Sequence, residues 1–128
     1  MVDKGHVEPK KEQLKVSLDR RPQGQAVISL EGSVDIATIK RFEAAFKWFN
    51  EQRLGYLVVD MTLLTYMSSS GFGLLIKAKA DCAKTNGDVV LVNPRTAILD
   101  VLKLLGLIHH FRVAASVEEA LVPPAPLA

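Results

Sequence analysis

The stretch LVVDMTLLTYMSSSGFGLLIKA, residues 57–78, decides the fold, because an apolar run turns there into serines and glycines. The run is rich in β-branched residues and nearly unbroken in apolarity, which is typical of a central strand covered on both faces; we expect this strand over residues 55–61. From Ser69 or Ser70 the apolar spacing becomes helical, and Asn86-Gly87 ends the helix. A strand that leads directly into a helix predicts an α/β domain.

The segments before this stretch predict a hairpin and a first helix. Residues 14–20 and 26–32 alternate apolar and polar side chains on either side of an RPQG turn, which favours a hairpin at one edge of the sheet. In residues 35–55 an apolar stripe recurs at helical spacing, and Asp35 is a plausible cap before the first turn. The stripe consists of Ile39, Phe42, Phe46 and Phe49, with Trp48 expected at its flank.

The segments after the stretch continue the alternation of strands and helices. We expect a buried strand over DVVLVN, a helix over PRTAILDVLKLLG with Ile98, Val101, Leu102 and Leu105 on its inner face, a strand over HHFRVA, and a last short helix. This order calls for right-handed crossovers between parallel strands. The predicted fold is a single α/β domain over residues 14–121, with a mixed, mostly parallel sheet of about five strands packed with about four helices. Residues 1–13 are expected to form a flexible tail and the proline-rich residues 122–128 a disordered one.

Composition narrows the classes of function. The 128 residues are 48% hydrophobic and carry a formal charge of +2, with no dense basic run of the kind that nucleic-acid binding requires. The single cysteine, Cys82, excludes an internal disulfide and suits a reducing compartment. There is no apolar run of about 18 or more residues and no secretory signal, so we expect a cytoplasmic protein without membrane insertion.

No catalytic set is apparent in the sequence. The nucleophile elbow of hydrolases needs a glycine two places before its serine, and Met67 stands there relative to Ser69. The glycines of SSSGFG lack the Gly-Lys-Ser/Thr of a phosphate-binding loop. His109 and His110 lie on a predicted strand and would point to opposite faces, one to the core and one to solvent, so a shared metal ion is not expected. We therefore expect neither enzymatic activity nor a cofactor or metal.

A serine at a helix start allows a different kind of function. Free backbone N–H groups and the positive end of the helix dipole favour an anion there, so a phosphate on such a serine would be stabilised by its own helix. The added charge, about −1.5 to −2, would disturb any partner docked over the turn. The structural alternative is that the serines only cap the helix.

Three segments of the sequence carry a resemblance to a known family: LEGSVDIAT, LVVDMTLLTYMSSSGFGLLIKA and VVLVNPRTAILDVLKLLGLIHHFRV. Together, over about residues 14–121, they resemble the STAS family, the anti-sigma factor antagonist domain. The resemblance implies a bacterial regulator that binds an anti-sigma factor, often a serine kinase of the histidine-kinase-like fold. That kinase phosphorylates the antagonist and a serine phosphatase reverses the reaction. The implied acceptor is Ser69. The implied partner surface spans Gly32–Thr38 and Ser68–Phe72, and its residues are Gly32, Asp35, Thr38, Ser68, Ser70, Gly71, Phe72 and Gly73.

Two features of this surface bear on its mechanism. Ser68 stands where the family usually has aspartate; a serine can cap the helix but supplies no charge to a partner. Phe72 is expected to be exposed, as an apolar anchor for the partner. Two alternatives to a phosphorylated antagonist remain open: a non-phosphorylated STAS scaffold subunit of a sensory or lipid-transport complex, and a small-ligand or nucleotide-binding module that holds an anion at Ser69–Gly71.

Overall fold

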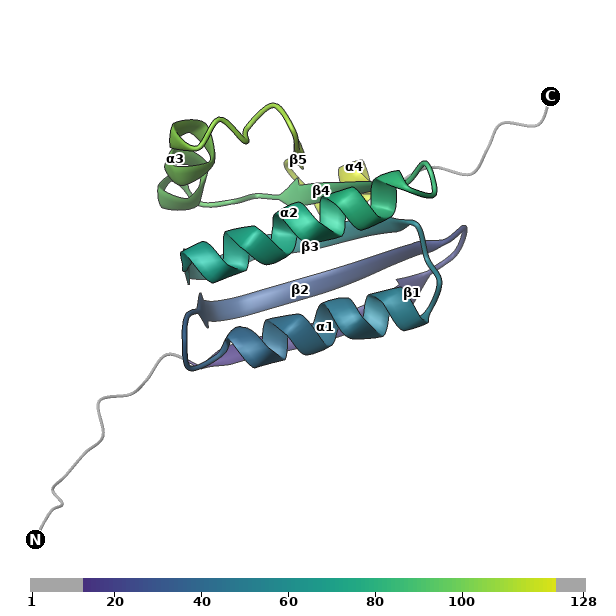
Figure 1. Cartoon of the computed structure of the whole chain (residues 1–128), viewed down its shortest axis with the longest axis horizontal. Helices are drawn as coiled ribbons and strands as arrows, with labels where there is room; N and C mark the ends of the chain where they lie inside the picture. The colour runs from purple at the N-terminus through teal and green to yellow at the C-terminus, as the bar shows by residue number, and fades with distance from the viewer. Residues whose placement is uncertain (1–12, 122–128) are drawn as a thin grey trace, which may run out of the picture.

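The structure is a computed structural model that describes residues 13–121 (Figure 1). Five strands form one sheet in the order β1-β2-β3-β4-β5; β1 is antiparallel to β2, and the other neighbours are parallel. The predicted α/β class, with a mixed, mostly parallel sheet and four helices, is confirmed. The elements are β1 (Leu14–Arg21), β2 (Gln25–Val34), α1 (Ile39–Glu51), β3 (Tyr56–Met67), α2 (Ser69–Ala83), β4 (Asp88–Val92), α3 (Thr96–Leu104), β5 (Arg112–Ala114) and α4 (Val117–Ala120).

The three crossover helices cover one face of the sheet. Phe42 of α1, Leu75 of α2 and Ile98 of α3 all join the same core cluster, as right-handed crossovers between strands in chain order require. Figure 1 shows α1 and α2 side by side over the strands. Alternation along β3 sends Leu57 and Val59 into the core beneath these helices, while Val58 joins a smaller cluster on the other face. That smaller cluster is where α4 packs.

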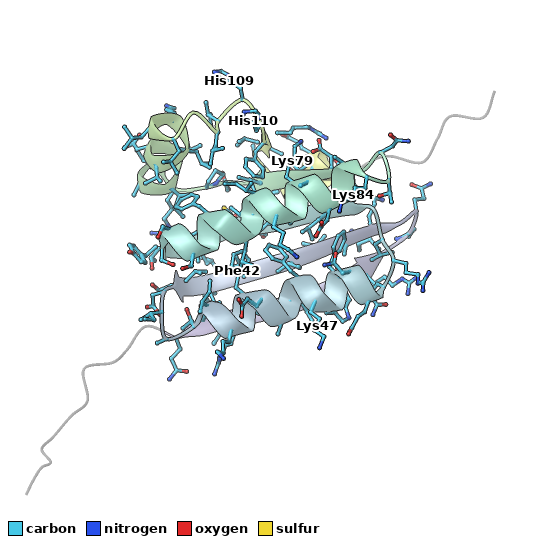
Figure 2. All side chains as sticks on the ribbon, in the orientation of Figure 1. Phe42, Lys47, Lys79, Lys84, His109 and His110 are labelled. Atoms are coloured by element: carbon cyan, nitrogen blue, oxygen red, sulfur yellow. The ribbon has the colours of Figure 1, made fainter. Side chains whose placement is uncertain are left out.

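The apolar stripe of α1 lies as predicted. Phe42, Phe46 and Phe49 are buried in the main core, with the rings of Phe42 and Phe46 4.6 Å apart, and Ile39 and Trp48 are partly buried at its margin. Lys47 points outward from the same helix (Figure 2). Burying this stripe against the sheet holds α1, and with it the loop that precedes α1, in a fixed position.

Three expectations about the elements were wrong. β3 runs for 12 residues, to Met67, because residues beyond Met61 go on pairing with β2 through two register irregularities. Leu105 is 54% exposed, because α3 has already ended there. His109 and His110 are both exposed and lie in a turn before β5, so neither faces the core (Figure 2). Of the tails expected at residues 1–13 and 122–128, all but Gln13 lies outside the described residues.

Candidate functional site

The predicted surface residues gather where β2 and β3 end. The loop after β2 leads into α1, and Ser68 leads from β3 into α2. The Ser68 N–H donates a hydrogen bond of 2.8 Å to the Val34 carbonyl, which joins the two segments directly. The carboxyl ends of parallel strands are where α/β domains commonly place their binding groups. The topology therefore brings together two stretches more than 30 residues apart in sequence.

Asp35 and Thr38 organise the loop before α1. The Asp35 carboxylate accepts hydrogen bonds from the backbone N–H groups of Ala37, at 2.9 Å, and Thr38, at 3.1 Å. The Thr38 hydroxyl is buried; it donates to the Ser33 carbonyl at 2.7 Å and accepts from the Asp35 N–H at 2.9 Å. Asp35 thus stabilises the turn that starts the helix, three residues before the N-cap position, which is Thr38 itself. Both side chains are engaged within the chain.

Ile36, between these two residues, was missed by the reasoning from sequence. Its side chain is 95% exposed, more than any other large apolar side chain in residues 13–121. Its neighbours Asp35 and Thr38 turn inward to make their hydrogen bonds, so Ile36 points outward. The signal that could have found it is its place directly after the aspartate of the turn before α1 and outside the apolar stripe of that helix.

The three serines differ in accessibility. Ser68 occupies the N-cap position of α2 with extended backbone angles (φ −75°, ψ 168°), but its side chain makes no capping hydrogen bond. Its Oγ is buried and has no hydrogen-bond partner within the described part of the chain. The expected cap by Ser68 is therefore absent from the structure. Ser69 and Ser70, at the first two positions of α2, are exposed.

Gly71 and Phe72 lie in the interior. Phe72 is only 4% exposed, so its expected role as a surface anchor is wrong. The reason is helical geometry: Phe72 lies three residues before Leu75, on the stripe that α2 buries. A Cβ added to Gly71 would meet Met67 Cγ at 2.5 Å and Val34 Cγ1 at 3.0 Å, so this glycine lets the start of α2 approach the strand ends closely.

The other two predicted glycines differ from each other. Gly32 has φ +116°, and a Cβ there would lie 1.9 Å from the Gln13 carbonyl oxygen, so its role is to allow the close approach of β1. Gly73 is exposed, and a Cβ there would meet nothing within 4 Å. A glycine in a helix interior costs about 0.5–1 kcal/mol relative to alanine. No contact among residues 13–121 explains why a glycine stands at position 73 despite this cost.

Four surface hollows within residues 13–121 are lined by none of the three serines. A hollow of about 640 Å³ lies between α1 and α2, but the aromatic rings in its floor, Phe46 and Phe49, are 7% and 2% exposed and offer little area to a ligand. Within residues 13–121 no group of three or more histidine, cysteine, aspartate or glutamate side chains could hold a metal ion. Nor is any helix in that range long and apolar enough to cross a bilayer.

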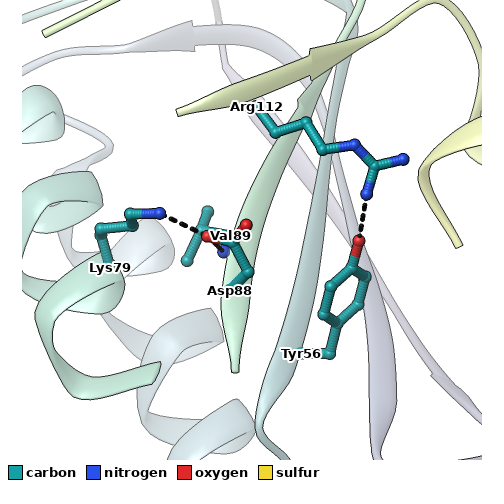
Figure 3. A network of polar contacts seen from close by, with 5 residues as sticks. All are labelled: Tyr56, Lys79, Asp88, Val89 and Arg112. Atoms are coloured by element: carbon teal, nitrogen blue, oxygen red, sulfur yellow. Dashed lines mark hydrogen bonds and ion pairs between the residues drawn. The ribbon is translucent and has the colours of Figure 1, made fainter. Parts of the chain in front are cut away.

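A polar network at the opposite end of β3 fastens α4 to the sheet; Figure 3 shows its Arg112–Tyr56 hydrogen bond. The Tyr56 hydroxyl donates to the Ala120 carbonyl at 2.8 Å and accepts from Arg112 at 2.7 Å, and Arg112 also donates to the Glu119 carbonyl at 3.0 Å. Burial raises the pKa of Tyr56, with the Arg112 charge opposing the shift. Because Tyr56 begins the strand that Met67 ends, this network is remote from Ser69.

Comparison with known proteins places the chain in a family. A sequence profile of the STAS domain matches residues 17–120. The chain is 25% identical over 107 residues, 84% of its length and 91% of the relative's, to the putative anti-sigma factor antagonist BtrV of Bordetella bronchiseptica.

Solved structures of such antagonists share the fold. An anti-sigma factor antagonist from Mycobacterium paratuberculosis superposes with a TM-score of 0.76 at 20% identity, covering 89% of this chain and 95% of that one. Unphosphorylated SpoIIAA superposes at 0.73 with 24% identity, covering 83% and 92%. The phosphorylated form of this Bacillus cell fate determinant superposes at 0.69 with 24% identity, covering 83% and 96%. Since the profile spans most of the chain, this protein belongs to the STAS domain family.

Proposed function

We propose that this protein is an anti-sigma factor antagonist, with Ser69 as its phosphoacceptor. It docks on an anti-sigma factor that is also a serine kinase of the histidine-kinase-like fold. The docking surface consists of the loop at Asp35–Thr38 and the exposed start of α2, with Ser69, Ser70 and Gly73. Gly32, Ser68, Gly71 and the buried Phe72 support this surface from within. A serine phosphatase would restore the unmodified state.

The observation that carries the proposal is the exposed Ser69 hydroxyl at a helix start that lacks a side-chain cap. Ser68 leaves the first N–H groups of the 15-residue helix α2 without a capping hydrogen bond. A phosphate on Ser69 brings a charge of about −1.5 to −2 to these groups and to the positive end of the helix dipole, where an anion is stabilised. The start of α2 therefore stabilises the phosphate on Ser69 in the free protein, whereas a partner bound over the same turn is displaced. The similarity of this chain to anti-sigma factor antagonists supports the same function.

Phosphate mapping tests the proposal. The purified protein is incubated with ATP and the purified histidine-kinase-like serine kinase encoded nearest to its own gene, and the phosphate is located by mass spectrometry. We expect one phosphate on Ser69, none in Ser69→Ala, and loss of kinase binding in Ser69→Glu. Ser70→Ala is the matched control, since Ser70 is also exposed and lies one position further along the helix; this variant should still be phosphorylated.

Ser68 stands where the family usually has aspartate. This replacement favours a second candidate function, that of a non-phosphorylated scaffold. The Ser68 hydroxyl carries no charge and is buried. It therefore gives a kinase no carboxylate that could orient the acceptor hydroxyl. In that case the same incubation would yield measurable binding without phosphate on any serine, and Ser69→Ala would bind as the wild type does.

A further inference from the structure

The docking surface offers a partner little charge. Among residues 33–38 and 68–73, Asp35 is the one ionisable side chain. Its Oδ1 accepts from two backbone N–H groups at 2.9 and 3.1 Å and lies 3.3 Å from the Thr38 hydroxyl; its Oδ2 lies 3.5 Å from the Ser33 hydroxyl. Because the Thr38 hydroxyl gives its one proton to the Ser33 carbonyl, three donors within the chain remain for this carboxylate, the two N–H groups and the Ser33 hydroxyl, and most of its hydrogen-bonding capacity serves the turn.

What the loop does offer a partner is Ile36. An aliphatic side chain that is 95% exposed does not stabilise the folded protein by burial. Its transfer from water into an apolar pocket of a partner is favourable. The backbone around it is already ordered by the hydrogen bonds of Asp35 and Thr38, and by the bond from Ser68 to Val34 that ties this loop to α2. Little conformational entropy therefore remains to be lost when Ile36 is buried.

We infer that the partner recognises this surface through an uncharged apolar socket that receives Ile36, with Ser69 and Gly73 at the border of the contact. This inference rests on the proposed function and names the chemistry of its partner. Gly73, where no Cβ intervenes, lets the rim of the socket approach α2 closely. A phosphate on Ser69 then acts chiefly by desolvation, because a dianion would have to be dehydrated beside an apolar contact that holds no cation.

Binding measurements with variants of Ile36 test the inference. The probe is the same neighbouring serine kinase, titrated calorimetrically at 50 and 500 mM NaCl. We expect Ile36→Ser to raise Kd at least tenfold, Ile36→Leu to raise it less than threefold, and the wild-type Kd to change less than threefold between the two salt concentrations. Leu18→Ser, an exposed apolar position on β1, is the matched control and should bind as the wild type does. The melting temperature of Ile36→Ser should equal that of the wild type.

The outcomes separate the inference from the proposed function. If Ile36→Ser binds like the wild type while Ser69→Glu does not bind, the socket is wrong and the proposed function stands. A wild-type complex that weakens tenfold or more at the higher salt concentration overturns the uncharged socket, because ion pairs then hold the partner. If the wild type itself does not bind, the proposed function is wrong, and the inference falls with it.

Discussion

Replacing Gly73 by alanine should stabilise the protein. Gly73 is the fifth residue of the 15-residue helix α2, and a Cβ there would meet nothing within 4 Å. The substitution therefore removes the cost of glycine in a helix interior, about 0.5–1 kcal/mol, without a steric penalty. With an unfolding entropy of about 2.1 cal/mol/K per residue over about 110 folded residues, 1 kcal/mol corresponds to a rise of about 4 °C in Tm.

Thermal unfolding and urea denaturation of the same variants measure this effect, and Gly71→Ala is the matched control. Gly71 lies on the same helix two residues earlier, but its added Cβ would lie 2.5 Å from Met67 Cγ, which is buried. Overpacking of this kind costs about 1–3 kcal/mol, so Gly71→Ala should lower Tm. A drop in Tm for Gly73→Ala would refute the reasoning, because it would mean that Gly73 stabilises the free protein.

The same variant should lose affinity while it gains stability. If the rim of a partner approaches α2 at Gly73, the added methyl group separates the two surfaces and raises Kd. A rise in Tm together with a rise in Kd would show that Gly73 contributes to binding and not to stability. Unchanged affinity would place Gly73 outside the interface.

Three further predictions follow from the contacts of the fold. Gly32→Ala should lower the urea midpoint strongly, since the added Cβ would lie 1.9 Å from a backbone oxygen at φ +116°. Tyr56→Phe should cost about 1 kcal/mol in urea denaturation by removing the bonds to Ala120 and Arg112, without changing phosphorylation of the serines. Burial raises the pKa of Cys82 from 9.0 to about 11, so the folded state keeps its proton longer and stability should fall as pH rises from 9 to 11, by about 1.4 kcal/mol per pKa unit. Cys82→Ala should show a shallower fall over that range.

Local patterns were sufficient wherever one face of an element had to be buried. The stripe of Phe42, Phe46 and Phe49 predicted the inner face of α1. Asn86-Gly87 predicted the end of α2 three residues late, since the helix ends at Ala83 and a turn leads to Asn86 at φ +60°. The length of β3 could not be predicted in this way, because Thr62, Thr65 and Tyr66 look like a polar linker. Pairing with β2, which lies more than 20 residues earlier in the chain, keeps them in the strand.

The sequence by itself determined the α/β class, the succession of strands and helices along the chain and the place of Ser69 at the start of a helix, because periodicity and turn residues act over a few neighbouring positions. Only the tertiary structure decided which residues of the two loops face outward. Phe72 lies within the motif from which the partner surface was predicted, yet it is buried because α2 must cover the sheet. Ile36 carries no motif, yet it is exposed because the hydrogen bonds of Asp35 and Thr38 hold the turn in that orientation. Burial depends on the packing of distant elements, which no local pattern records.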